Sequence, residues 1–295
     1  MTKTVTMTIV FQAGSLNYGE GIANISELKK FHRGNGEAYT YASRQSLRYD
    51  IVRLGNELFG WNLNTVDKAS GVVQFKKDVT IEDSVEMDLF GYLKTDKSSQ
   101  KRAAVVRLSH AVSLEPYKSD LEFLNNMGLA SRIGADPNLA QIEQHQSFYC
   151  YTITIDLHRI GVDGEVELSN QEKAKRVQQL LDIVKLLNRN IRGRRENLSP
   201  LFVIGGVYDV ANPFFLGKIR LASSPRGWEI DLAPIEDTMA QTFAGKPVAD
   251  GTRIGLVSGI FANEDEFAQR FAEKTGSVEQ FFRHIAEQVQ TYYGE

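Results

Sequence analysis

Apolar and polar residues follow two periodic patterns along the chain, and together these patterns predict a protein that contains both strands and helices. Alternation with a period of two predicts strands at residues 2–12 and 148–158. The second strand has an apolar face and a polar face, made of Tyr151, Ile153, Ile155 and Leu157 against Thr152, Thr154, Asp156 and His158. A further strand at residues 201–210 contains Gly205 and Gly206, which indicate a bulge or a close approach of another backbone.

Apolar residues spaced three and four apart predict the helices. The first helix occupies the second half of residues 39–58, and its inward face carries Leu47, Ile51, Leu54 and Leu58. A second helix follows Ser169, which forms a capping box with Glu172. Two more helical pieces, at about residues 264–291, end the chain, and a short helix is also compatible with residues 26–31.

The order of these elements is strand, helix, excursions, strand, helix, strand and strand. This order is close to the βαββαβ arrangement and indicates an α+β fold with a ferredoxin-like, RRM-like core. We expect a single discontinuous domain over residues 1–295, although this length also allows two domains. Two β excursions interrupt the core. One is a finger-like hairpin at about residues 60–110, and the other covers about residues 115–147.

The tip of the first excursion, KTDKSSQKR, is basic. It carries four cationic residues against the single Asp96, namely Lys94, Lys97, Lys101 and Arg102. The tip is either the basic end of a hairpin that contacts an anionic partner or a solvated turn.

Composition and charge narrow the class of protein. Hydrophobic content of 42% and charged content of 24% are ordinary for a globular chain. No run of about 18 apolar residues predicts a membrane span, the start does not resemble a signal peptide, and Cys150 is the single cysteine, so a cytoplasmic protein is expected. The net charge of −3 counts mildly against a free-standing nucleic-acid binder, although a local basic groove can coexist with acidic faces.

Enzyme signatures are absent from the sequence. It contains no phosphate-binding P-loop, dinucleotide fingerprint, zinc-protease helix or nucleophile elbow. The five histidines have no spacing typical of metal ligands, and the acidic segments at residues 82–88 and 263–266 are not convincing cation sites. We therefore expect neither a catalytic residue nor a cofactor.

Basic and amide side chains gather at the start of the first helix. Ser43 stands in the N-cap position, and Arg44, Gln45 and Arg48 follow within a turn and a half. The unpaired N–H groups of a helix start favour anions, so cations at this position suggest a phosphate-binding site. The alternative is that these arginines are only solvated.

A second basic segment follows the helix that begins near residue 169. It contains Arg189, Arg192, Arg194 and Arg195 around Gly193. Cations complement a helix C-terminus, but four arginines in seven residues exceed that need. Together with the segment from Lys29 to Arg33 and its aromatic neighbours, these patches are typical of a groove that binds a single nucleic-acid strand.

The segment FHRGNGEAYTYASRQSLRYDI resembles an element of a CRISPR-associated family, the backbone subunit of type I Cascade complexes, which is seventh in the Cas naming scheme. Within that family, the segment resembles subtype I-B and its DevR-like branch. Further loose matches follow in the same order and span most of the chain, namely NYGEGIANI, DLFGY, VVRLSHAVSL and RGRRENLSPLFVIGGVYDV. One departure stands out, because many relatives carry two adjacent basic residues where this chain has Arg48 and Tyr49.

The resemblance implies a non-enzymatic protein that binds guide RNA (crRNA), with Ser43, Gln45 and Arg48 against the RNA backbone. Copies of the subunit would assemble in a filament along the RNA, beside other Cascade Cas subunits, and present the guide for pairing with target DNA. No membrane partner is implied. The full set of expected RNA-binding residues is Ser43, Arg44, Gln45, Arg48, Arg192, Arg194 and Arg195, with Asn17, Lys29, Lys30 and His110 as further candidates.

Two other functions stay open at this point. Some related backbone subunits cleave RNA with a metal ion, so a metal-dependent CRISPR-associated ribonuclease is the first alternative. The second is a developmental regulator that binds duplex DNA. A backbone subunit should protect RNA and leave it intact, whereas a regulator should prefer a duplex sequence.

Overall fold

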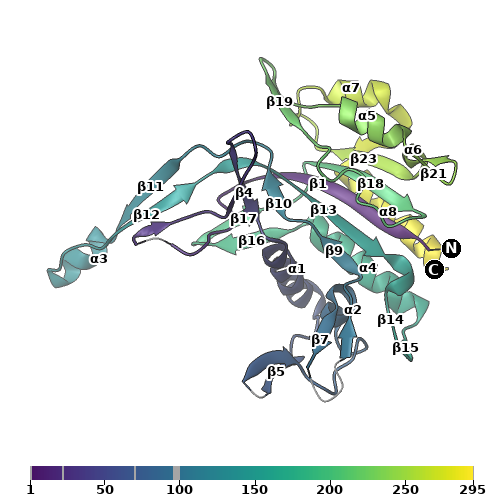
Figure 1. Ribbon diagram of the computed structural model, residues 1–295, viewed down its shortest axis with the longest axis horizontal. Coiled ribbons are helices and arrows are strands. Elements are labelled where there is room, and N and C mark those ends of the chain that lie inside the picture. Colours follow the sequence, from purple (N-terminus) through teal and green to yellow (C-terminus); the bar gives the residue numbers. More distant parts are fainter. Residues whose placement is uncertain (1, 22, 70, 96–99, 295) are drawn as a thin grey trace.

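The computed structural model describes residues 2–21, 23–69, 71–95 and 100–294. Within these residues, nine strands form one sheet that runs through the middle of the molecule (Figure 1). Across the sheet they are β24 (Thr275–Ser277), β23 (Thr252–Leu256), β18 (Phe202–Tyr208), β1 (Thr4–Gly14), β13 (Gln146–Asp156), β10 (Ala111–Ser113), β4 (Ala38–Ala42) and β3 (Lys30–His32), with β9 (Val106–Leu108) also paired to β13.

The centre of this sheet has the ferredoxin-like order that the sequence predicts. Strand β1 lies between β18 and β13, and β13 pairs on its other edge with β9 and β10, all antiparallel. Helix α1 (Arg44–Phe59) connects β1 toward β9 and β10, and helix α4 (Asn170–Lys185) connects β13 to β18. The α+β, RRM-like fold class is therefore confirmed.

One face of the sheet packs against helices. Apolar side chains of β1 and β13 form a core cluster with α1, α4 and α8 (Val278–Tyr293). The apolar stripe of α1 is buried at Leu47, Ile51 and Leu54, as expected. Leu58 is 52% exposed, contrary to expectation, because the last helical turn extends past the core and Trp61 packs against Gly55 instead.

The other face packs against the C-terminal third of the chain. Its core includes residues of α5 (Ala233–Ala240), α6 (Val248–Gly251), α7 (Glu264–Arg270) and the hairpin of β19 (Leu221–Ser224) and β20 (Gly227–Ile230). The expected close approach at Gly205 and Gly206 is confirmed, since Cβ atoms there would lie 2.0 Å from the Thr6 carbonyl oxygen and 1.7 Å from that of Gly251. Helix α8 begins with a capping box between Ser277 and Gln280.

Residues 60–105 form a small lobe beside α1. It contains α2 (Val85–Phe90) and the hairpins β5 (Val66–Ala69)–β6 (Val72–Phe75) and β7 (Tyr92–Lys94)–β8 (Gln100–Arg102). Its link to the core is the buried Asp88 carboxylate, which accepts hydrogen bonds from Arg102 at 2.7 Å and from Arg176 of α4 at 2.9 Å.

The prediction of a basic tip on this lobe is wrong for two of its four cations. Arg102 is buried against Asp88, and the buried Lys94 ammonium donates to the backbone oxygens of Lys77 and Val79. Lys94 points into the lobe's own loop, whereas Arg102 points toward Asp88 of α2 and the backbone oxygens of Arg159 and Val162. Lys101 is exposed, and Lys97 lies outside the described residues.

A long arm projects from the body of the molecule (Figure 1). It consists of β11 (Asp120–Asn125) and β12 (Leu139–Gln144) with α3 (Met127–Ala130) and a 3-10 turn at Ser131–Ile133 between them. Residues 25–26 add a parallel strand, β2 (Ile25–Ser26), to β12. The short helix considered at residues 26–31 is therefore wrong, since strands β2 and β3 occupy the segment and pair with β12 and β4.

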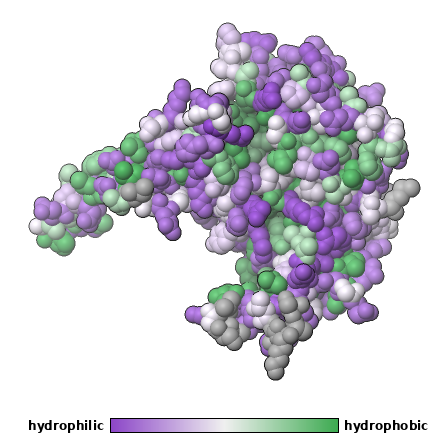
Figure 2. Space-filling model, in the orientation of Figure 1, coloured by the Kyte–Doolittle hydropathy of each residue, from purple (hydrophilic) through white to green (hydrophobic). Residues whose placement is uncertain are grey.

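The surface of the arm is unusually apolar (Figure 2). Its side chains face solvent along β11, at the tip and at Leu139, whereas Ile142 and Glu143 of β12 are buried. The large exposed apolar residues of the arm are Leu121, Phe123, Leu124, Met127, Leu129, Ile133 and Leu139.

Candidate nucleic-acid interface

Helix α1 begins at a capped and well-positioned serine. The Ser43 hydroxyl accepts a hydrogen bond from the Ser46 backbone N–H at 3.2 Å, which confirms the predicted N-cap. The Ser43 backbone N–H donates in turn to Oδ1 of Asn17 at 3.1 Å. Ser43 is buried, so it holds the helix start in place and brings Asn17 to it.

Arg44 and Gln45 point into solvent from the first turn of α1. Among the described residues, neither side chain has a hydrogen-bond or ion-pair partner. The backbone N–H of Arg44 donates to Nδ1 of His110 at 3.1 Å. Burial, together with the nearby charges of Arg44 and Lys29, lowers the pKa of His110, which favours the neutral imidazole that this hydrogen bond needs.

An aromatic cluster adjoins Arg44. The rings of Phe31 and Tyr41 stack with their centroids 4.1 Å apart and an interplanar angle of 11°. His110 meets both rings edge-on, at 5.8 Å from Phe31 and 5.1 Å from Tyr41. Because Phe31 is 38% exposed, the cluster offers a flat apolar surface beside a free guanidinium group.

Arg48 and Lys30 are held by carboxylates of their own chain. The Arg48 guanidinium lies 2.7 Å from Oε1 of Glu86 and 5.2 Å from the ring centre of Phe90. Lys30 binds both carboxylate oxygens of Glu143, at 2.6 and 2.7 Å. The sequence identified the two cations but not their partners, which are distant along the chain.

The second basic segment is a hairpin of β16 (Asn188–Ile191) and β17 (Arg194–Asn197). Its turn places Arg192 and Gly193 at positive φ, 46° and 76°, as a two-residue type I′ turn requires. The Arg192 guanidinium lies over the ring of Tyr18, 4.3 Å from its centre. Tyr18 follows Asn17 directly, so this contact connects the hairpin to the start of α1.

The other arginines of the hairpin differ in their surroundings. Arg189 lies inside the fold, where it pairs with Asp50 at 2.7 Å and donates to the Leu16 carbonyl oxygen. Arg194 is paired with Glu196 at 3.1 Å. Arg195 is exposed and donates to Oδ1 of Asn190 at 3.0 Å.

The structure therefore brings most of the predicted residues to one continuous surface. Asn17, Ser43, Arg44 and His110 are joined by hydrogen bonds, and the backbone N–H of Lys29 donates to the Asn17 carbonyl oxygen at 2.9 Å. Arg192 joins through Tyr18, a residue that the sequence analysis did not single out. The only feature of the sequence that could have indicated a role for Tyr18 is its position in the NYGEGIANI segment.

The remaining predicted cations add less positive charge to this surface, because most of them are paired with carboxylates. Arg48, Lys30 and Arg194 are ion-paired, and Arg195 lies on the hairpin without a contact that links it to the start of α1.

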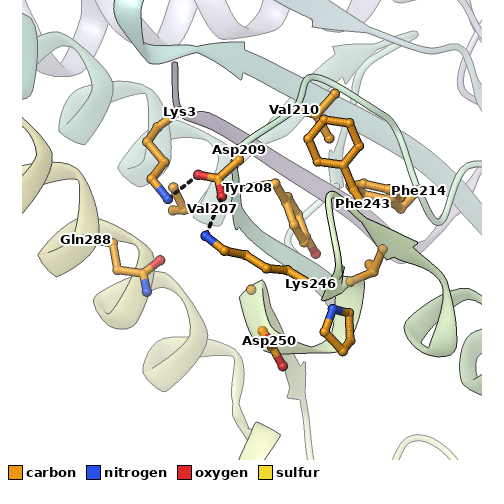
Figure 3. A pocket seen from close by; sticks show the side chains of 13 residues that line it. Lys3, Val207, Tyr208, Asp209, Val210, Phe214, Phe243, Lys246, Asp250 and Gln288 are labelled. Atoms are coloured by element: carbon orange, nitrogen blue, oxygen red, sulfur yellow. Dashed lines mark hydrogen bonds and ion pairs between the residues drawn. The ribbon is translucent and has the colours of Figure 1, made fainter. Parts of the chain in front are cut away.

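A pocket of about 400 Å³ at the other end of the sheet is lined by two cations and two carboxylates, namely Lys3, Lys246, Asp209 and Asp250 (Figure 3). Lys3 and Lys246 both reach the Asp209 carboxylate, at 2.6 and 3.3 Å. Their hydrogen bonds lower the pKa of Asp209, which keeps it ionised. The two lysines therefore offer less attraction to an anion than the partner-free Arg44.

Two negative findings hold for the described residues. No group of three or more His, Cys, Asp or Glu side chains is placed to hold a metal ion. In the same part of the chain, no helix combines the length and apolar character needed to cross a membrane.

These features define an RRM-like α+β protein with a basic and aromatic surface at the start of its first core helix. The sequence profile of the family described as "CRISPR-associated negative auto-regulator DevR/Csa2" matches residues 5–222, and the chain belongs to this family. The CRISPR-associated resemblance predicted from the sequence is thus confirmed.

One solved structure has a similar fold over nearly the whole chain, and a second gives a weaker match. One chain, from a structure entitled "CRISPR RNA-guided surveillance complex", is 13% identical, with a TM-score of 0.51 over 98% of this chain and 99% of that chain. Another, from "CRISPR RNA-guided surveillance complex, pre-nicking", is 14% identical, with a TM-score of 0.47 over 72% of this chain and 80% of that chain. A comparison with curated protein sequences finds no match.

Proposed function

We propose that this protein is a guide-RNA-binding backbone subunit of a CRISPR surveillance complex. The observation that carries the proposal is the continuous surface of Arg44, Lys29 and Arg192, which have no carboxylate partner among the described residues. Membership of a CRISPR-associated family supports the choice of RNA as the anion.

The chemistry of this surface suits a strand of any sequence. Guanidinium groups bind phosphates with strong charge-assisted hydrogen bonds, and phosphates carry no sequence information. The stacked rings of Phe31 and Tyr41 add a flat surface for a base or ribose, which tolerates every base. A subunit that must hold any guide needs this combination.

The ion pair of Arg48 is compatible with a role in RNA binding. Arg48 and Glu86 are both partly exposed, and such surface pairs contribute only about 0–1 kcal/mol. A phosphate can therefore replace Glu86 at small cost, which leaves Arg48 available once RNA is bound. The same argument applies to Arg194 and Glu196.

The projecting arm supports assembly along the RNA. Its apolar side chains face solvent and point away from the body that could bury them, and exposed apolar patches mark protein contacts. We propose the next copy of the same chain as the partner. Contact between the arm of one copy and another surface of its neighbour is head-to-tail, and such contacts repeat into a filament.

The proposal includes a non-enzymatic role in the cytoplasm. The subunit would hold the guide in an array with other Cascade subunits and leave its bases free to pair with target DNA. The alternative, a metal-dependent ribonuclease, predicts loss of RNA in the presence of magnesium.

Expression beside a repeat-spacer array tests the proposal. We expect the purified protein to carry RNA of uniform length that stays intact with magnesium. The double variant Arg44→Ala, Arg192→Gly should lose this RNA, because it removes two cations. Glycine accepts the positive φ of residue 192, and the contact with Tyr18 is lost together with the charge. The matched control is Arg226→Ala, Arg270→Ala, which removes two exposed arginines on β20's turn and α7. Equal RNA in both variants would contradict the proposal.

A further inference from the structure

A pocket of about 500 Å³ lies beside the first turn of α1, between this helix and β9. Polar and cationic side chains line one part of it, and apolar side chains line the rest. The lining includes Arg44, Gln45, Arg48, Arg107, Phe90 and Leu108. Arg107, which lies on β9, does not belong to the set predicted from the sequence.

The guanidinium groups of this pocket are only partly neutralised. Arg107 is 49% exposed and lies 2.7 Å from Oδ2 of Asp156, but the same oxygen lies 3.5 Å from Arg159. One carboxylate cannot neutralise two arginines. Arg48 has Glu86, and Arg44 has no carboxylate partner among the described residues. The pocket therefore keeps excess positive charge that an anion can balance.

The apolar lining makes the pocket selective for more than a simple anion. Phe90 lies under the Arg48 guanidinium, 5.2 Å from ring centre to the guanidinium carbon, and Leu108 follows Arg107 on β9 by one residue. A ligand that combines a negative charge with a flat, weakly polar group would satisfy both parts. A nucleotide within an RNA strand has this composition.

We propose that this pocket binds one nucleotide of the RNA strand, with Arg107 contacting its phosphate and the apolar lining contacting its ribose or base. The assignment rests on the proposed function and extends it, since the strand then passes from the Arg192 hairpin across the start of α1 to β9. Asp156 positions the Arg107 guanidinium at the pocket.

Salt titrations of RNA affinity test this assignment. The probe is a short fluorescent oligouridylate that admits one copy of the protein. Each lost phosphate contact flattens the plot of log affinity against log salt by about 0.7 for a single strand, or about five-fold in affinity at 0.1 M salt. We expect Arg107→Ala to show this change and Arg107→Lys, which keeps the charge, to retain most of the slope.

The matched control is Arg270→Ala. Arg270 is 50% exposed, so it matches Arg107 in charge and exposure, but it pairs with Glu236 at 3.0 Å and with Glu266 at 3.6 Å and lies on α7. Its removal should leave the slope unchanged. Arg192→Gly reports on the proposed function without touching this pocket.

The outcomes separate the two proposals. A flatter slope for Arg107→Ala, but not for Arg270→Ala, supports the pocket. An unchanged slope for Arg107→Ala beside a flatter one for Arg192→Gly overturns the pocket and leaves RNA binding in place. Unchanged slopes for both overturn RNA binding at this surface. Thermal melts of Arg107→Ala and Arg107→Lys confirm that each variant is folded before it is compared.

Discussion

The backbone N–H of Arg44 donates to the imidazole Nδ1 of His110 at 3.1 Å. This hydrogen bond ties the first turn of α1 to the loop between β9 and β10. It exists only while His110 is neutral at Nδ1, because a protonated imidazole can no longer accept. The position of the unpaired Arg44 is therefore linked to the protonation state of His110.

The first prediction concerns the pH dependence of stability. Burial, Arg44 and Lys29 lower the pKa of His110 below its ordinary value of 6.5, so the unfolded chain binds more protons than the folded chain as pH falls through this region. The contribution of His110 to stability is present above about pH 6.5 and is lost as pH falls toward the folded pKa.

Urea unfolding at about pH 7.5 and about pH 5.5 measures this effect. We expect the wild type to lose more unfolding free energy between these pH values than the His110→Gln variant, whose amide oxygen accepts at both. Burial also lowers the pKa of His145 and His284, but these residues are common to both proteins. Equal losses in the two proteins would show that His110 makes no such contribution.

The second prediction separates positioning from charge at the start of α1. Ser43→Ala should cost about 1 kcal/mol of stability, the usual effect of losing an N-cap. It should also weaken RNA binding without changing the salt slope, since no phosphate contact disappears. Arg44→Ala should instead flatten the slope by about 0.7.

Ser277→Ala is the control for Ser43→Ala. The Ser277 hydroxyl caps α8 in the same way, accepting from the Gln280 N–H at 3.1 Å. Its loss should cost similar stability and leave RNA affinity intact. If Ser43→Ala flattens the salt slope as Arg44→Ala does, its role is not simply to hold the helix start.

The interface shows how far the sequence alone could lead. Local signals were sufficient for the cap at Ser43 and for the exposed cations Arg44 and Arg192, because capping and turn chemistry depend on neighbours in the chain. Arg48 and Lys30 looked equivalent to them. Their partners, Glu86 and Glu143, are distant in sequence, and only the packing of the α2 lobe and the arm brings them close.

For the fold as well, the sequence predicted features that depend on neighbouring residues and missed features that depend on distant ones. Alternation predicted β1 and β13 because apolar residues recur at every second position of each strand. It did not show that the polar faces are buried as well, as Thr6 and Thr154 are. It could not predict that Lys94 and Arg102 turn inward, since the Asp88 carboxylate and the carbonyl oxygens that receive them belong to other elements. Arg107 was missed because a lone arginine in a strand has no local pattern that distinguishes it.

The third prediction concerns the buried charges that join the α2 lobe to the core. Asp88 accepts from Arg102, from Arg176 and from the Gly161 backbone N–H, and the three charged side chains are almost fully buried. Asp88→Asn keeps the shape but removes the buried carboxylate that the two guanidinium groups share. Among the carboxylates of the described residues, Arg176 then keeps only Glu172, at 3.0 Å, and Arg102 keeps only Asp163, at 3.8 Å. Breaking such a network costs about 3–5 kcal/mol, which urea unfolding should detect.

Glu229→Gln, which breaks the exposed pair with Arg226, is the control and should cost less than about 1 kcal/mol. Comparable losses for the two variants would mean that Asp88 is not a main link.

The last prediction concerns the arm. Phe123 is 58% exposed and Ile133 is 81% exposed, so replacing both with serine removes little packing within the subunit. Unfolding free energy should stay within about 0.5 kcal/mol per site, as is usual for surface positions. Assembly should fail nevertheless, because the proposed contact with the next copy loses its apolar surface.

On a long RNA, the wild type should form arrays of several copies by light scattering, whereas the variant should bind as separate subunits of normal single-site affinity. Val73→Ser, which removes a similarly exposed apolar residue from β6, should assemble like the wild type. Arrays of normal length in the Phe123→Ser, Ile133→Ser variant would exclude the arm as the contact between copies.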